Sequence, residues 1–217
     1  MPEGYAIVYC QGAFNTPNGK TAHGLVRFTR RYNILSVIDS RYAGFDAGEV
    51  LDGKKNGITI FATLKDAYDN AVTDGANPSH LVVGLAPDGG RLSTEEKMNI
   101  ARGIDYGLNI DSGLHDFLSE DEEIAKAAEE KGVFIRDVRR TPRRDDHHFF
   151  TGKIEHVDCL KIAVLGTDSA IGKRTTAWLI VHAFEKAGLK CEMIGTGQTA
   201  WMQGAKYCII LDSLIND

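Results

Sequence analysis

The sequence predicts an α/β protein in which a doubly wound, mostly parallel sheet is followed by a second, P-loop NTPase-like α/β domain. Short apolar runs alternate with helix-like stretches over residues 5–138, the spacing of parallel strands joined by crossover helices. A proline- and arginine-rich stretch at 139–152 interrupts that alternation. Beyond it, a glycine-containing turn at 166–176 joins an apolar run to a helix, as in proteins that bind phosphate.

The first domain is expected to contain five strands and four helices. Its apolar runs predict strands at residues 5–10, 34–39, 57–61, 80–85 and 133–138. Helices are expected at 20–31 and 64–72. Two more follow capping-box patterns: Ser93 with Glu96 opens a helix that ends near residue 106, and Ser119 with Glu122 opens one that ends at residue 131. Residues 112–118 are interpreted as a turn.

The stretch at 139–152 is interpreted as a linker of mixed charge between domains 1–138 and 153–217. Adjacent residues of an extended chain point in opposite directions, so a metal site is disfavoured at Asp145, Asp146, His147 and His148. A second reading gives the linker arginines a role in clamping a phosphate or carboxylate between the domains: Arg139, Arg140, Arg143 and Arg144.

The second domain is predicted to contain only strands at 160–166, 190–195 and 207–212 and one helix at about 172–187. So small a parallel sheet leaves apolar faces and a strand edge open. We therefore expect residues 153–217 to be the start of an incomplete P-loop domain, which a longer chain or another copy in a homo-oligomer completes.

Composition limits the classes of partner. The formal net charge of -5 argues against non-specific binding to nucleic acid, which needs a basic surface. No apolar run is long enough to span a membrane, and the N-terminus does not resemble a signal peptide. The widely spaced cysteines, expected to be buried thiols, fit a cytoplasmic protein: Cys10, Cys159, Cys191 and Cys208.

The sequence GTDSAIGKRTT at 166–176 predicts a phosphate-binding loop. It supplies small residues, a lysine and a helix N-terminus, which are what such a loop needs to surround an anion. Its spacing departs from the usual pattern, because Thr167 takes the position of the first glycine. The predicted cofactor-binding residues are Gly166, Thr167, Asp168, Ser169, Ala170, Ile171, Gly172, Lys173, Arg174, Thr175 and Thr176.

Whether this loop also binds magnesium is left open by the sequence. Arg174 occupies the position where a hydroxyl normally binds the metal ion, so either Thr175 or Thr176 substitutes for it or the loop binds no metal; Thr175 is the candidate metal ligand. Asp212 ends a predicted strand, the position from which a carboxylate reaches a magnesium-bound water in P-loop enzymes. The alternative is an aspartate that caps the strand or forms a turn, as at the ends of many core strands. Asp168 either meets a second substrate or the metal, or shapes the loop through an Asx turn.

Two further segments are candidates for ligand contact. Residues 195–204 are expected to form a loop beside the phosphate loop, where Gln198 and Thr199 bind the cofactor. Asp39 ends the second strand, where dinucleotide-binding folds place the carboxylate that holds a ribose hydroxyl, although no Gly-x-Gly-x-x-Gly accompanies it.

His115 and Asp116 are the candidate catalytic pair, together with Asp168. They lie in the sequence SGLHD at 112–116, where a general acid or base at the end of a strand reaches a substrate. The alternative is that His115 is a solvated or packing residue of a turn.

With these residues in view, the chain resembles a bacterial and archaeal two-domain family of formerly unknown function that includes D-glutamate N-acetyltransferases. The matching motifs run along nearly the whole chain: KTAHG at 20–24, GLAP at 84–87, SGLHDFL at 112–118, DVRR at 137–140, the loop at 166–176 and GTGQT at 195–199. The spacing of the loop also resembles that of dethiobiotin synthetases.

The family resemblance implies a Rossmann-like N-terminal domain, a P-loop C-terminal domain and, in some members, acetyl transfer from acetyl-CoA to the amine of D-glutamate, a small-molecule substrate. The resemblance to dethiobiotin synthetases implies an alternative, an ATP- and Mg²⁺-dependent ligase or kinase with Lys173 on the phosphates. A third hypothesis is a non-catalytic nucleotide-sensing or assembly module.

Overall fold

The structure, a computed structural model, describes residues 1–141, 145, 149–168 and 171–210. Its largest element is a six-stranded sheet of order β3-β2-β1-β4-β5-β6, whose ladders are all parallel. The strands are β1 (Gly4–Tyr9), β2 (Tyr32–Ile38), β3 (Thr59–Phe61), β4 (Pro78–Val83), β5 (Asn109–Ser112) and β6 (Ile135–Asp137). This is the strand order of the doubly wound dinucleotide-binding fold, so the predicted fold class is confirmed.

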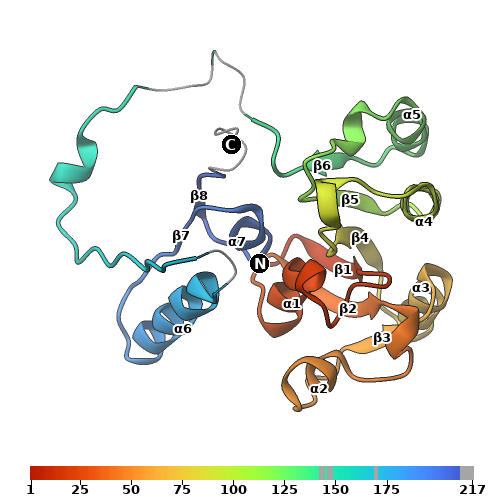
Figure 1. The fold of residues 1–217 in the computed structure, drawn as a ribbon, viewed down its shortest axis with the longest axis horizontal. Coiled ribbons are helices and arrows are strands. Elements are labelled where there is room, and N and C mark those ends of the chain that lie inside the picture. Colours follow the sequence, from red (N-terminus) through yellow and green to blue (C-terminus); the bar gives the residue numbers. More distant parts are fainter. Residues whose placement is uncertain (142–144, 146–148, 169–170, 211–217) are drawn as a thin grey trace.

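Helices cover both faces of this sheet. Those of the first domain are α1 (Lys20–Arg27), α2 (Ala47–Asp52), α3 (Leu64–Thr73), α4 (Thr94–Asp105) and α5 (Glu122–Lys131). In Figure 1, α3, α4 and α5 lie along one side of the sheet and α1 lies on the other. Burial on both faces explains the continuous apolar run of the central strand β1, where Ala6, Ile7 and Val8 are fully buried.

One of the two predicted capping boxes is present. Ser93 Oγ accepts the backbone N–H of Glu96 at 3.3 Å, and the Glu96 carboxylate accepts the N–H of Ser93 at 2.6 Å, so α4 begins where the pattern indicates. The second box is wrong, because α5 begins at Glu122 with Asp121 as its N-cap. The Ser119 hydroxyl instead donates to Asp137, 2.5 Å away.

Other differences from the predicted elements have local causes. The expected turn at 112–118 is preceded by β5, whose polar residues hide its strand character: Asp111 is buried and accepts a hydrogen bond from the Tyr32 hydroxyl at 2.6 Å. The short helix α2 was not predicted. Helix α1 ends at Arg27 rather than at residue 31, because the chain after it turns to contact the second domain: the backbone N–H of Arg30 donates to the carbonyl of Gln203 at 2.9 Å.

The second part of the chain contains α6 (Lys173–Lys186), β7 (Ile194–Gly195), α7 (Gln198–Met202) and β8 (Tyr207–Cys208). Helix α6 confirms the predicted helix. The predicted strands are shortened to a two-residue parallel pair, β7 with β8. The run at 160–166 is not a strand, since it pairs with no described residue and both Leu160 and Leu165 are more than 80% exposed (82% and 85%).

Helix α7 belongs to the second part of the chain but packs on the first domain. Met202 is fully buried within the main apolar core. The side-chain amide of Gln203 donates to the carbonyls of Gly24 at 2.8 Å and Phe28 at 2.9 Å, and its oxygen accepts the indole N–H of Trp178 at 3.1 Å. One buried glutamine therefore joins α1, the chain after it, and α6.

The cysteines only partly follow the prediction. Cys10 is buried, and burial raises the pKa of its thiol well above the usual range. Cys159 is exposed because the residues around it pack against no sheet. Within the described ranges, the structure contains no helix of the length and apolar character needed to cross a membrane.

Candidate functional site

The N-terminus of α6 has the features of an anion-binding site. Gly172 is its N-cap, with a left-handed backbone (φ 98°) that favours glycine, and no side chain caps the helix. The N–H groups of the first turn are therefore free of intrahelical partners and available to an anion. The Lys173 ammonium lies at the same place and donates to the carbonyl oxygen of Asp168. The described residues of the loop thus fit a bound phosphate.

The other predicted residues of the loop differ in accessibility. Thr175 and Thr176 are exposed, whereas Arg174 is partly buried against α1. Ser169 and Ala170, predicted to bind the cofactor, lie outside the described residues, as does Asp212, predicted to bind metal. In the rest of the chain, no group of three or more His, Cys, Asp or Glu side chains is arranged to hold a metal ion. The role of Thr175 toward a metal stays a prediction.

The segment at 195–204, expected to be a ligand-contacting loop, forms α7 and contacts the first domain. Thr199 Oγ1 lies 3.0 Å from Thr21 Oγ1, and Gln198 packs so closely on Gly113 that a Cβ there would lie 2.7 Å from its Cγ. Gln198 and Thr199 are 7% and 4% exposed. Their predicted cofactor contact stays a prediction, and their observed role is to hold the two domains together.

The loop that carries His115 and Asp116 is held in place by buried groups. The Asp137 carboxylate accepts the backbone N–H groups of Leu118 and Ser119, each at 3.0 Å. Arg139 Nε donates to the carbonyl of Gly113 at 2.5 Å. These contacts explain why the motifs at 112–118 and 137–140 occur together: the second fixes the shape of the first.

His115 itself is exposed and lies over Gly90, whose Cβ position would be 3.2 Å from the ring. Asp116 is partly buried, and no hydrogen bond joins it to His115 among the described residues. The imidazole is therefore free to act on a substrate from the carboxyl-end edge of the sheet, which is where open α/β sheets bind ligands. The catalytic assignment of His115, Asp116 and Asp168 stays a prediction.

Asp39, the candidate for holding a ribose hydroxyl, is bonded to its own domain instead. It is fully buried, and its carboxylate accepts the N–H of Phe14 at 2.8 Å and the Arg41 guanidinium at 2.7 and 3.1 Å. Burial raises the pKa of Asp39, but the hydrogen bonds from Arg41 and Phe14 outweigh it and hold the pKa below its usual value. Because both oxygens are occupied, Asp39 fixes the loop after β1 instead of binding a ligand.

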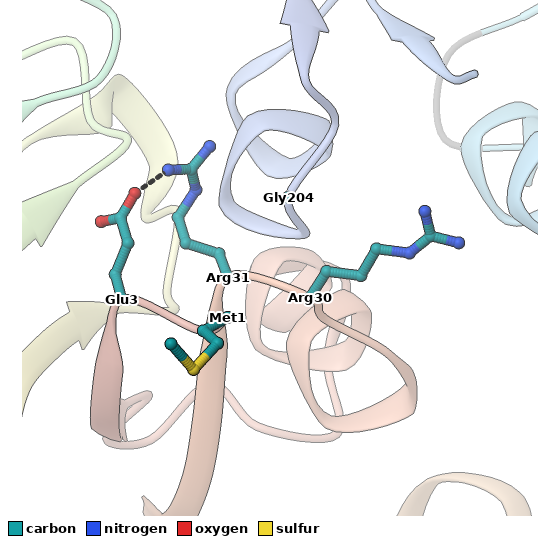
Figure 2. Close-up of a pocket in the computed structure, with 5 residues that line it drawn as sticks. All are labelled: Met1, Glu3, Arg30, Arg31 and Gly204. Carbon is teal, nitrogen blue, oxygen red and sulfur yellow. Dashed lines mark hydrogen bonds and ion pairs between the residues drawn. The ribbon is translucent and has the colours of Figure 1, made fainter.

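A hollow of about 170 Å³ lies at the contact between the domains, lined by Met1, Glu3, Arg30, Arg31 and Gly204. Figure 2 shows Arg31 turned to Glu3 and Arg30 extended in the other direction. Arg30 reaches Glu185 of α6 at 2.6 Å, and Arg31 Nε donates to the carbonyl of Trp201 at 2.8 Å. Since both guanidinium groups have partners, this hollow is a part of the interdomain contact and not a candidate ligand site.

Gln203 and Thr21, which join the domains, were not identified as contact residues from the sequence. Only the neighbouring glycines in the sequence indicate this contact. A Cβ at Gly24 would lie 3.0 Å from Arg174 Nη2, and Gly204 has a left-handed backbone beside Arg30. Glycines at such positions mark the close approach of two elements.

Comparison with known proteins assigns both parts of the chain. Residues 40–141 match the Rossmann-like domain of unknown function DUF1611_N, and residues 148–217 match the P-loop domain of unknown function DUF1611_C. In structure, the chain is similar to a DUF1611 family protein from Anabaena variabilis ATCC 29413, with a TM-score of 0.85 and 25% identity. That similarity covers 99% of this chain and 59% of the other.

Two curated relatives carry the name D-glutamate N-acetyltransferase. The one from Tritonibacter scottomollicae is 32% identical over 128 residues, which are 57% of this chain and 36% of the relative. The one from a Pseudoalteromonas species is 29% identical over 117 residues, 54% of this chain and 34% of the relative. The matched part is therefore about a third of each relative.

Proposed function

Because this chain belongs to the DUF1611 family, we propose that it forms the acetyl-CoA-binding part of an N-acetyltransferase that acts on D-glutamate or a related amino acid. The observation that carries the proposal is the uncapped N-terminus of α6, with the Lys173 ammonium beside it. Arg174 of the same turn holds this helix end against Lys20 of the first domain. The names of the two curated relatives supply the reaction.

In this proposal the loop at 166–176 holds phosphate groups of coenzyme A through the free N–H groups of α6 and through Lys173. The neutral amine of the acceptor attacks the thioester carbonyl, the C–N bond forms and the C–S bond breaks. His115 takes the proton that the amine loses and gives it to the leaving thiolate, which yields the N-acetylated amino acid and free coenzyme A. Its exposure, and the hold of Asp137 and Arg139 on its loop, support this role.

The nature of residue 174 favours acetyl transfer over an ATP-dependent ligase or kinase. A magnesium-assisted loop places a hydroxyl there, and in this chain that position is an arginine turned toward α1. Coenzyme A phosphates need no metal to bind a helix N-terminus and a lysine. A metal-independent site is therefore expected.

The test is a transfer assay with acetyl-CoA and D-glutamate, in which mass spectrometry measures the N-acetylated product. The proposal expects product from the wild-type chain and losses of at least about 100-fold in His115→Gln, the general base, and in Lys173→Ala. Glu130→Gln, on the exposed surface of α5, is the control and should keep full activity. ATP hydrolysis or phosphoryl transfer in place of acetylation, or no turnover with ligand-dependent association, would contradict the proposal.

A further inference from the structure

The guanidinium of Arg174 lies in the α1–α6 seam, defined here as the contact of Arg174 with Lys20, His23, Gly24 and Arg27. Its Nη2 lies 3.3 Å from the carbonyl oxygen of Lys20, and a Cβ at Gly24 would lie 3.0 Å from the same nitrogen. Its Nε is buried without a hydrogen-bond partner. The packing fixes the group from one side and leaves its hydrogen-bonding capacity largely unused.

The charge in this seam is unbalanced. Burial lowers the pKa of Arg174 to about 10, and repulsion by Arg27 adds to the effect. Arg27 has its own counter-ion, since its Nη2 lies 2.6 Å from the Asp52 carboxylate. No ion pair joins Arg174 to an acidic side chain within the part of the chain that the structure describes. A local excess of positive charge thus exists in a chain whose net charge is -5.

Arg174 is only partly buried, and its other terminal nitrogen, Nη1, makes no hydrogen bond with the described residues. Unlike Nε, Nη1 is not one of the buried atoms left without a partner, so it is the nitrogen that a ligand can reach. A guanidinium presents its N–H groups in a planar fork that matches a carboxylate. Arg174 follows Lys173 directly in α6, so an anion bound at Nη1 lies beside the phosphate loop.

The linker arginines expected to clamp a carboxylate either have partners in the first domain or lie outside the described residues. Arg139 donates to the carbonyl of Gly113, and Arg140 donates to Glu120 at 3.0 Å. Arg143 and Arg144 lie outside the described residues. The carboxylate clamp expected in the linker is therefore better placed in the seam.

We propose that Arg174 binds a carboxylate of the amino-acid acceptor, at a subsite between the phosphate loop and α1 that is separate from the phosphate-binding backbone. The inference rests on the proposed function, which supplies an acidic amino acid as acceptor, and adds the residue that selects it. The excess of cations in the seam and the unbonded Nη1 of Arg174 carry the assignment. Lys20, with an exposed side chain on the first turn of α1, is the second cation that such a ligand meets.

Calorimetric titration of the chain with D-glutamate tests the subsite, with Arg174→Gln and Arg174→Lys as variants. The matched control is Lys126→Gln, which removes one positive charge from the exposed surface of α5. A charge-assisted hydrogen bond from Nη1 predicts that Arg174→Gln raises the Kd by about tenfold or more. Arg174→Lys, which keeps the charge but loses the planar guanidinium, should give an intermediate Kd, and Lys126→Gln should leave the Kd within about twofold of wild type. Tryptophan fluorescence checks that each variant is folded. If Arg174→Gln does not fold, the Kd of Arg174→Lys alone tests the proposal.

Equal Kd values in the wild type and the folded Arg174 variants, or no binding of D-glutamate to the wild type, would overturn the proposal. So would a parallel loss of D-glutamate and acetyl-CoA affinity in Arg174→Lys, because that indicates a purely structural role. D-glutamate binding that depends on Arg174 in a chain that does not bind acetyl-CoA would support the subsite while contradicting the proposed function. The two failures are thus distinguishable.

Discussion

Replacing Gln203 with alanine is expected to release α6 and α7 from the first domain. The side chain is 4% exposed and makes three hydrogen bonds, to the carbonyls of Gly24 and Phe28 and from the indole of Trp178. The Gly24 carbonyl keeps its helical bond from the N–H of Phe28, so two buried groups lose their partners. At about 1–3 kcal/mol for each unpaired group, the expected cost is roughly 2–6 kcal/mol.

Urea unfolding followed by tryptophan fluorescence measures this effect directly, because both tryptophans of the chain, Trp178 and Trp201, lie in the interdomain contact. With an m-value of about 2 kcal/mol/M, the midpoint should fall by about 1–3 M. The matched control is Gln11→Ala, since Gln11 bonds to Ser40 on the exposed surface and its loss should change stability by less than about 0.5 kcal/mol. Equal midpoints for the two variants would refute the reasoning.

Three further perturbations test the packing and the charges. Gly113→Ala places a Cβ 2.7 Å from Gln198 and should destabilise the contact with α7 by about 1–3 kcal/mol. Asp137→Asn weakens the hold on the His115 loop and should cost about 1–3 kcal/mol and lower kcat of acetyl transfer more than it changes KM. Burial lowers the pKa of His80 below its usual value of 6.5, so the unfolding free energy should fall as the pH drops below 6.5, by at most about 1.4 kcal/mol per pH unit, and His80→Gln should flatten that dependence.

Each of these has a measurement that would contradict it. Thermal unfolding of Gly197→Ala serves as the control for Gly113→Ala, because nothing lies within 4 Å of its Cβ position, and equal losses in both would refute the close-packing argument. A kcat of Asp137→Asn equal to that of the wild type would separate the loop from catalysis. The same pH dependence of stability with and without the imidazole would show that His80 does not titrate as expected.

The central strands and the phosphate-loop helix could be predicted from sequence because their signals are local. The run at 5–10 is apolar throughout since β1 is buried on both faces, and Gly172 followed by Lys173 marks the start of helix α6. The shape of the His115 loop was not predictable in this way. It depends on Asp137, which is distant in sequence and reaches it through hydrogen bonds from Leu118 and Ser119.

The interdomain contact was missed for a similar reason. Residues 198–202 include glutamine, threonine and tryptophan, a composition that predicts ligand contact. In the structure, Thr199 instead contacts Thr21, and Trp201 and Met202 pack on the core of the first domain. The predicted strand at 160–166 has the right composition but no neighbouring strand among the described residues, and a strand without a partner is not formed. Pairing of this kind is a tertiary property that one segment does not reveal.

The measurement that tests the central claim most directly is calorimetric titration of the chain with acetyl-CoA and with ATP, each with and without magnesium, in the wild type and in Lys173→Ala. The account predicts acetyl-CoA binding that is independent of magnesium and lost in the variant, because the free N–H groups of α6 and the Lys173 ammonium hold the phosphates. Magnesium-dependent binding of ATP alone, or acetyl-CoA binding that Lys173→Ala leaves unchanged, would contradict it.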